Sequence, residues 1–167
     1  MEEELKGKTV LVTGGTGSIG SEIVKQIFNY EINKVIIFSR DEIKHFLIKK
    51  RILDERLETV VGDIRDYRSV QRVFEDFDID LIYHAAAMKH VVLCEDFPIE
   101  SAKTNIFGTQ NVVDLAVKYG VPKLLTISTD KSAYPVNVMG ATKFIAEKIT
   151  LNANYSCVRF GNVANSR

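Results

Sequence analysis

The chain has 167 residues, a length that suits one domain with a substantial hydrophobic core. Its 22 basic and 22 acidic side chains balance, so the charge favours neither nucleic acid nor an anionic membrane as a partner. No apolar run reaches the length of a membrane span, and the acidic start at Met1–Glu4 is unlike a signal peptide. We therefore expect a cytoplasmic globular protein without a membrane segment. Cys94 and Cys157 lack Cys-x-x-Cys spacing, so we expect buried thiols and no metal site.

An apolar run at residues 10–12 leads directly into a turn rich in glycine. This spacing is typical of a strand that turns sharply into a helix, where backbone N–H groups can approach a pyrophosphate. A plain tight turn is the alternative, but the amphipathic stretch 21–30 and the apolar run 35–38 complete a strand–helix–strand unit. We expect the cofactor phosphates to bind at Gly14, Thr16, Gly17, Ser18, Ile19 and Gly20.

The end of the second predicted strand, residues 34–39, indicates which dinucleotide binds. Sites for NAD usually carry an acidic residue here, whereas this strand ends in Ser39 and Arg40, with Lys44 one turn later. Positive side chains suit a ribose 2′-phosphate, so the sequence predicts NADP in preference to NAD. The alternative is a surface ion pair of Arg40 with Asp41 or Glu42.

The remaining pattern alternates apolar strands with helical segments. We expect strands at 58–61, 79–84, 123–128 and 155–160, and helices at 41–56, 67–77, 99–119 and 138–151. Six strands alternating with helices predict an α/β fold with a doubly wound parallel sheet of the Rossmann type, in strand order 3-2-1-4-5-6. For the helix at 41–56 we expect an inner side made of Ile43, Phe46, Leu47, Ile48 and Leu53.

Two further loops lie where a dinucleotide would cross the sheet. Asp63 and Ile64 follow the third strand, where a carboxylate can accept from the adenine amino group or, alternatively, cap the next helix. Ala85, Ala86 and Ala87 follow the fourth strand, where small side chains leave room for a ligand, although three alanines alone more often belong to a helix or to tight packing.

Groups able to exchange protons follow the fifth strand. Thr129, Asp130 and Lys131 place an acid and a base in one turn at the carboxyl edge of the sheet, where ligands of such folds bind. Met139 and Lys143 share one face of the next helix, and Lys143 is suited to hydrogen-bond a nicotinamide ribose. Its alternative is a solvated surface lysine.

Several motifs together resemble the extended short-chain dehydrogenase/reductases, and more narrowly their polysaccharide-biosynthesis branch, which contains UDP-N-acetylglucosamine 4,6-dehydratases. The resemblance covers nearly the whole chain, and its most specific parts are the Lys-His-Val and Ser-Thr-Asp-Lys blocks. The matching blocks are Thr13–Gly20, Ala85–Val91, Lys103–Thr109, Ser128–Lys131, Asn137–Lys143 and Arg159–Val163.

The resemblance implies an internal redox cycle on a UDP-sugar: hydride leaves C4 for NADP, water is lost across C5 and C6, and hydride returns to C6. By position, Lys131 would be the base at C5, Asp130 the acid at the C6 hydroxyl, and Thr129 a hydrogen-bond partner of the 4-oxygen. Lys143 would orient the nicotinamide ribose. The resemblance further implies that Lys89 and Asn105 line the cofactor site, and that the substrate is bound by Lys89, Asn162 and Arg167. It also implies a homo-oligomer.

Two features depart from the family pattern. Met139 stands where the superfamily carries a proton-exchanging tyrosine, which leaves Lys131 or Tyr134 as bases for the 4-hydroxyl. The family's second half, which closes over the UDP-sugar, is absent, so residues 1–167 are expected to form the NADP-binding domain alone. A nucleotide-sugar 4-epimerase or reductase, or a non-catalytic NADP-binding module, are the alternatives to a dehydratase.

Overall fold

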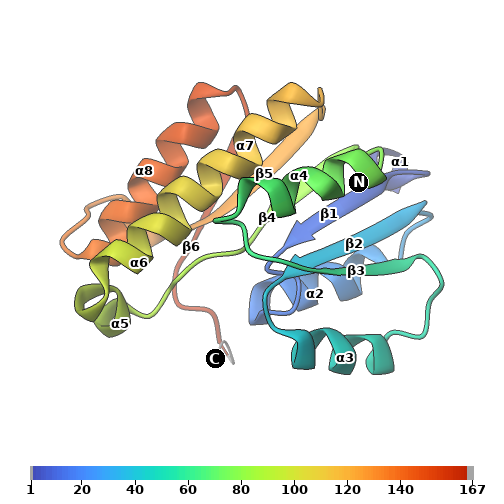
Figure 1. Cartoon of the computed structure of the whole chain (residues 1–167), viewed down its shortest axis with the longest axis horizontal. Helices are drawn as coiled ribbons and strands as arrows, with labels where there is room; N and C mark the ends of the chain where they lie inside the picture. The colour runs from blue at the N-terminus through green and yellow to red at the C-terminus, as the bar shows by residue number, and fades with distance from the viewer. Residues whose placement is uncertain (1, 165–167) are drawn as a thin grey trace.

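The computed structural model describes residues 2–164 and contains one parallel sheet. Its strands are β1 (Thr9–Thr13), β2 (Lys34–Ser39), β3 (Leu57–Val61), β4 (Leu81–His84), β5 (Lys123–Thr129) and β6 (Ser156–Phe160). They pair in the order β3-β2-β1-β4-β5-β6 (Figure 1). This order confirms the predicted doubly wound Rossmann-type sheet, in which the direction of winding reverses between β1 and β4.

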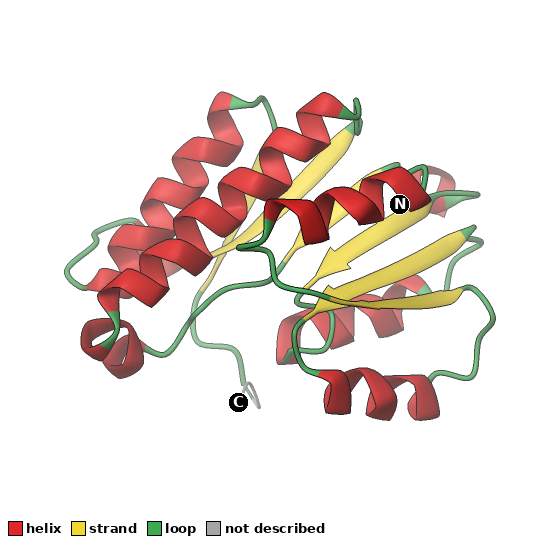
Figure 2. Cartoon of the chain, in the orientation of Figure 1, coloured by secondary structure: helices red, strands yellow, loops and turns green. Residues whose placement is uncertain are grey.

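Helices cover the sheet in two layers. They are α1 (Glu2–Leu5), α2 (Ser18–Ile27), α3 (Glu42–Arg51), α4 (Tyr67–Asp76), α5 (Val91–Asp96), α6 (Pro98–Ala102), α7 (Gly108–Lys118) and α8 (Val138–Asn152). Helices α2 and α3 lie on one side of the sheet, whereas α4, α7 and α8 lie on the other (Figures 1 and 2). None of the described helices is long and apolar enough to cross a membrane.

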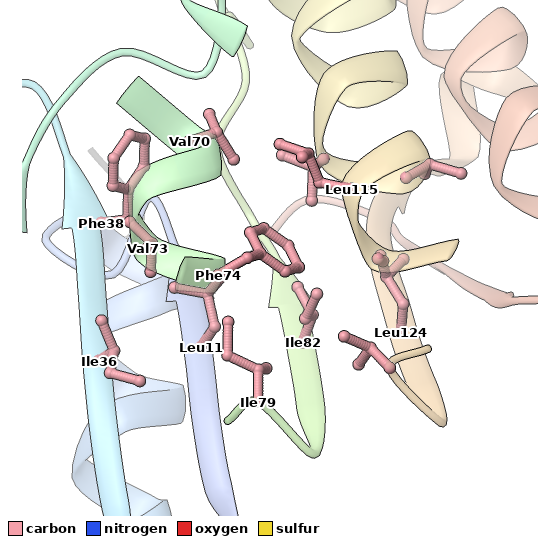
Figure 3. Close-up of a cluster of buried hydrophobic side chains, with 14 of the residues drawn as sticks. Leu11, Ile36, Phe38, Val70, Val73, Phe74, Ile79, Ile82, Leu115 and Leu124 are labelled. Atoms are coloured by element: carbon pink, nitrogen blue, oxygen red, sulfur yellow. The ribbon is translucent and has the colours of Figure 1, made fainter. Parts of the chain in front are cut away.

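The central strands are buried on both faces, which explains their uninterrupted apolar runs. Successive side chains of a strand point to opposite faces. Leu11 and Phe38 accordingly join the cluster beneath α4 and α7, and Val12 and Ile37 join the cluster beneath α2 and α3. Figure 3 shows the first cluster, in which side chains of α4 pack against those of β1 and β2.

Helix α3 differs from the prediction for residues 41–56. It is shorter, and the side chains at Ile43, Phe46 and Leu53 are 66%, 59% and 91% exposed, so the expected inner side is wrong apart from Ile48. The buried positions are His45 and Ile48. Apolar residues occur all around this segment, so the apolar pattern does not identify the helix face that meets the sheet. On the observed face, Ile48 joins the apolar cluster and His45 hydrogen-bonds with Ser39.

The predicted helix 99–119 contains an irregular segment. Helix α6 passes into α7 through a π-helical segment at Lys103–Phe107. Thr109 Oγ1 donates to the backbone oxygen of Asn105 at 2.7 Å within this stretch. Such π-helical segments are frequent at functional sites. The helix then ends before Gly120, whose positive φ of 66° is the left-handed conformation that stops a helix.

Candidate functional site

Two cavities meet at the carboxyl ends of β1 and β4. The larger, of about 520 Å³, is bordered by residues that follow β5 and β6, and the smaller, of about 190 Å³, by residues that follow β1, β2 and β3. Ala85 and Ala87 line both of them. The two cavities, together called the cleft, therefore adjoin each other at the switch point of the sheet, and the alanines occupy the position at which we expected room for a ligand.

The glycine turn after β1 borders this cleft. Gly14 has a positive φ of 68°, and a Cβ at this residue would lie 2.7 Å from the backbone nitrogen of Ala86. A Cβ at Gly20 would collide with the carbonyl group of Gly14, so the start of α2 packs directly on the turn. Beside Gly17, by contrast, a Cβ would meet only the Gly14 oxygen, at 3.2 Å. Gly17 caps α2 without a side chain, which leaves room for an anion to approach the helix N-terminus.

The smaller cavity brings together most of the residues predicted for the adenosine half of the cofactor. They are Gly14, Thr16, Gly17, Ser39, Arg40, Lys44, Asp63, Ile64, Ala85, Ala86 and Ala87. Ser39 Oγ lies 2.8 Å from Thr16 Oγ1. Arg40 Nη1 lies 3.7 Å from Asp63 Oδ2, so Arg40 pairs across the cavity with Asp63, and not with the neighbouring acids that the alternative named. Ser18 and Gly20 belong to the first turn of α2 behind this cavity.

Asp63 is not the cap of helix α4. Asp66 fills that role, because its side chain accepts from the backbone nitrogens of Arg68 and Ser69. The Asp63 carboxylate instead accepts from the backbone nitrogen of Arg65 at 3.0 Å and from its Nε at 2.8 Å. Asp63 is therefore held in place at the edge of the cavity.

Thr104, in the π-helical segment, also borders the smaller cavity. Its side-chain oxygen is buried and has no hydrogen-bond partner within residues 2–164. Buried polar atoms are normally hydrogen-bonded, so an unpaired hydroxyl beside a cavity fits a bound polar ligand. The residues of the smaller cavity therefore fit a dinucleotide, because they combine this hydroxyl with open space at Gly17 and with the positive side chains of Arg40 and Lys44. The sequence pattern did not predict Thr104, because nothing in it indicates a π-helical turn.

The larger cavity contains the residues predicted for the nicotinamide and sugar side. Ile19, Lys89, Thr129, Lys131, Met139, Lys143 and Asn162 line it. Lys143 is only 7% exposed, so it is not a solvated surface lysine. Its Nζ donates to the carbonyl oxygen of Ile127 at 2.5 Å, and burial lowers the pKa of its ammonium group to about 8. Lys143 therefore presents a fixed, partly desolvated donor at the floor of the cavity.

The turn after β5 holds an acid and an amine in contact. Lys131 Nζ lies 3.3 Å from Asp130 Oδ1 and 3.4 Å from Asn162 Oδ1. Thr129 Oγ1 donates to Asp130 at 3.0 Å, and this bond together with Lys131 lowers the pKa of the Asp130 carboxyl. Asp130 is thus ionised in the free chain. Asp130 is exposed and is not among the described residues that line the cavity.

Glu147, one helical turn after Lys143, fixes this loop from beneath. The carboxylate is 3% exposed and lies 2.5 Å from Ser132 Oγ, which itself lies 2.6 Å from the carbonyl oxygen of Thr129. Arg159 of β6 donates to the same carboxylate. Although burial opposes ionisation, these hydrogen bonds lower the pKa of Glu147 to about 2. Glu147 thereby ties β5, β6 and α8 together around the loop, a role that we did not predict.

Asn105 has a different place from the one expected. It is 1% exposed and lies outside the lining of both cavities among the described residues. Its Oδ1 accepts from the Met88 nitrogen at 2.8 Å, and its Nδ2 donates to the Met88 oxygen at 3.0 Å. Asn105 therefore shapes the loop after β4 instead of touching a ligand directly. Arg167, expected to bind substrate, lies outside the described residues.

His84 forms a second buried support beneath the cleft. The Thr109 hydroxyl donates its hydrogen to the backbone oxygen of Asn105, so it accepts a hydrogen bond from His84 Nε2 at 2.9 Å. The other ring nitrogen, Nδ1, then carries no hydrogen and accepts from the Thr13 hydroxyl at 2.7 Å. Burial lowers the pKa of His84 to about 3, so the ring is neutral. It joins β1, β4 and α7, and the sequence pattern did not single it out.

Comparison with known proteins decides the family. A family model described as polysaccharide biosynthesis protein matches residues 10–167. The chain belongs to the polysaccharide-biosynthesis branch of the extended short-chain dehydrogenase/reductases. The chain spans about half the length of the curated relatives it matches.

Two relatives of this family carry different enzyme names. A UDP-N-acetylglucosamine 4,6-dehydratase (inverting) of Campylobacter jejuni is 43% identical over 171 residues, which cover 96% of this chain and 51% of the relative. A UDP-glucose 4-epimerase of Rickettsia canadensis is 39% identical over 173 residues, which cover 96% of this chain and 50% of the relative. Among solved structures, Pen from Bacillus thuringiensis superimposes with a TM-score of 0.93 at 40% identity, covering 98% of this chain and 52% of Pen. The family is therefore that of nucleotide-sugar dehydratases and epimerases.

Proposed function

We propose that this chain is the NADP-binding part of a UDP-sugar 4,6-dehydratase, of the UDP-N-acetylglucosamine type, for cell-surface polysaccharide synthesis. One observation carries the proposal. The two cavities meet at Ala85 and Ala87, with the basic pair Arg40 and Lys44 in one and Lys131 in the other. A dinucleotide that crosses the switch point would have its 2′-phosphate at the first end and its nicotinamide at the second.

Bound NADP would supply the site where a hydride is taken up from the sugar and given back. The residues that would hold it are those around the cleft. Arg40 and Lys44 would neutralise the 2′-phosphate, and the turn at Gly14–Gly17 would receive the pyrophosphate at the start of α2. Asp63 would accept from the adenine amino group, and Lys143 would donate to the nicotinamide ribose.

The turn after β5 would carry out the loss of water. Lys131 would take the proton from C5 of the sugar, and Asp130 lies one hydrogen bond away, at 3.3 Å. Because Asp130 is ionised in the free chain, it can receive a proton from Lys131 and deliver it to the departing C6 hydroxyl. Thr129 would hydrogen-bond near the 4-oxygen, and Lys89 and Asn162 would contact the sugar nucleotide.

The base for the 4-hydroxyl follows from what borders the cavity. Met139 occupies the position of the superfamily's tyrosine and cannot exchange a proton. Tyr134 is 87% exposed and is absent from the described lining of the cavity. We assign the 4-hydroxyl proton to Lys131 as well, since Lys131 borders the cavity. Its amine would pass this first proton to Asp130 before it takes the proton from C5, and would return the second proton to C5 when hydride reaches C6.

A 4-epimerase is the second candidate, and the identity to the Rickettsia canadensis protein favours it. The mass of the product separates the two reactions, because a dehydratase removes one water whereas an epimerase leaves the mass unchanged. The test is incubation of the chain with NADP and UDP-N-acetylglucosamine, followed by mass spectrometry. Loss of one water supports the dehydratase. NADP binding without any change in the sugar nucleotide, even when a longer chain that includes the family's second half is supplied, favours a non-catalytic cofactor-binding module.

Lys131 provides the matched variant for this assay. Lys131→Ala would abolish water loss and leave NADP binding intact, because Lys131 borders the larger cavity and lies outside the lining of the smaller one. A variant that still removes water at the full rate would exclude Lys131 as the base.

We also propose that copies of the chain associate through α7 and α8. Apolar side chains are exposed on both helices, including Phe107 at the N-cap of α7 at 61%, Val117 of α7 at 55% and Ile145 of α8 at 42%. Exposed apolar residues concentrated on neighbouring helices are typical of protein interfaces. Sedimentation of wild-type chain and of Phe107→Ser would test this association, with a monomeric wild-type chain as the contrary result.

A further inference from the structure

His45 lies behind the positive end of the smaller cavity, on α3. It is 4% exposed, and its Nε2 lies 3.1 Å from the carbonyl oxygen of Ser39 and 2.8 Å from Ser39 Oγ. A carbonyl oxygen can only accept, so Nε2 carries the hydrogen. Nδ1 is buried without a hydrogen-bond partner within residues 2–164, so it is the bare nitrogen of a neutral ring. Burial of the ring also lowers the pKa of His45, which keeps the ring neutral.

This arrangement determines what Ser39 can offer to a ligand. The Nε2 hydrogen is shared between the carbonyl oxygen and the hydroxyl of Ser39, so the hydroxyl accepts from His45. The hydrogen of Ser39 itself then points to Thr16 Oγ1 at 2.8 Å, and because both residues border the cavity, a ligand oxygen there would compete with Thr16 for this hydrogen. His45 therefore turns Ser39 into a hydrogen-bond donor toward the cavity.

The neighbouring groups complete a set of donors. Arg40 and Lys44 border the same cavity as Ser39. The nearby carboxylate of Asp41 is already engaged, because it accepts from the backbone nitrogen of Lys44 at 3.0 Å and lies 3.1 Å from its Nζ. A phosphate monoester accepts hydrogen bonds through all its free oxygens, whereas a ribose hydroxyl must also donate one. A site with donors and an occupied carboxylate selects the phosphate.

We propose that His45 is a positioning residue for cofactor selection: by holding Ser39 as a donor, it contributes to the preference for a ribose 2′-phosphate over a 2′-hydroxyl. The inference rests on the proposed NADP site and adds a specificity-determining residue to it. His45 does not border the cavity, so its effect would pass through Ser39.

The test compares two probes that differ only in the 2′-phosphate: adenosine 2′,5′-bisphosphate and adenosine 5′-monophosphate. Calorimetry would give the ratio of their affinities for the wild-type chain, His45→Leu, His45→Gln and Ser39→Ala. We expect His45→Leu to lower the ratio about tenfold, the effect of one hydrogen bond to a charged group, with little change in monophosphate affinity. His45→Gln, whose amide can donate from near the position of Nε2, should retain the wild-type ratio.

A double variant tests whether the effect passes through Ser39. His45→Leu combined with Ser39→Ala should lower the ratio no further than Ser39→Ala alone, because both changes remove the same interaction. Ile43→Ala, on the exposed side of the same helix, is the control for general effects on α3.

The outcomes separate this inference from the proposed function. A wild-type chain with no preference for the bisphosphate would overturn the NADP site and this inference with it. A clear wild-type preference that His45→Leu leaves unchanged would overturn the role of His45 alone. An equal loss of affinity for both probes in both His45 variants would also overturn it, since that result indicates only a structural role.

Discussion

The guanidinium of Arg159 donates two hydrogen bonds to the buried carboxylate of Glu147, at 3.0 Å from Nε and 2.7 Å from Nη2. This pair joins β6 to α8 beside the turn that carries Thr129 and Lys131. The Arg159–Glu147 salt bridge therefore supports the turn after β5 without being part of the proposed ligand site. Its loss would affect the site through the fold.

Glu147→Gln is predicted to lower the free energy of unfolding by about 2 kcal/mol, because it leaves the Arg159 charge without its partner. Arg159 is partly exposed, which keeps the loss below that of a fully buried pair. Urea denaturation followed by circular dichroism measures the difference. Glu22→Gln is the control, since Glu22 contacts only the exposed Gln26 and Lys25 among its recorded partners and should change stability by less than about 0.5 kcal/mol. Equal effects of the two substitutions would contradict the assigned role.

The Glu147–Arg159 pair also predicts how the free energy of unfolding changes at acidic pH. The pKa of Glu147 falls from its ordinary 4.5 to about 2 in the folded chain, so its contribution to stability is present above pH 4.5 and is lost as the pH falls toward 2. The stability difference between wild type and Glu147→Gln should therefore shrink across that range. A difference that stays constant down to pH 2 would show that the carboxylate is not held by its charge.

Lys143 predicts how the free energy of unfolding depends on pH in the alkaline range. Its pKa is lowered from 10.5 to about 8 by burial, so between those values the unfolded chain binds more protons than the folded one. The free energy of unfolding of the wild type should rise with pH across this window, relative to Lys143→Met. Denaturation series of both proteins from pH 7.5 to 10.5 give this difference. A flat difference would mean that Lys143 has no lowered pKa.

Gly14 and Gly120 form a matched pair for the strand-to-helix turn. Both have positive φ, at 68° and 66°, but a Cβ at Gly120 would meet no atom within 4 Å, whereas at Gly14 it would press on the backbone of Ala85 and Ala86. Gly120→Ala should cost about 1 kcal/mol for the backbone conformation alone. Gly14→Ala should cost more than twice as much and weaken dinucleotide binding, as thermal unfolding and calorimetry would reveal. Equal costs would contradict the close approach of β1 and the loop after β4.

The sheet and the position of the cleft were predictable because they depend on features that sequence displays directly. Apolar runs mark strands buried on both faces, and the glycines at 14, 17 and 20 mark the turn. The inner side of α3 was not predictable, since Ile43, Phe46 and Ile48 provide apolar residues on several faces of one helix. The buried face of α3 instead contains a polar contact, between His45 and Ser39.

The supports of the site were hidden for a related reason. Glu147 and His84 act through contacts between elements far apart in the chain, and residue spacing gives no sign of such contacts. Thr104 depends on a π-helical segment, which residue spacing does not indicate either. Lys143 illustrates the same limit, because its burial depends on how α8 packs against β5. Site residues that directly follow a strand were thus easier to predict from the sequence than the buried residues that keep them in position.

Calorimetric titration of the chain with NADP, and separately with NAD, tests the central claim most directly. The account predicts tighter binding of NADP, by about tenfold or more, and loss of that difference in Arg40→Ala with the NAD affinity unchanged. Arg40 is suited to this test because its side chain is 57% exposed and pairs only loosely with Asp63, at 3.7 Å, so its removal should leave the fold intact. Binding of NAD in preference to NADP, or binding of neither, would contradict the proposed cofactor site.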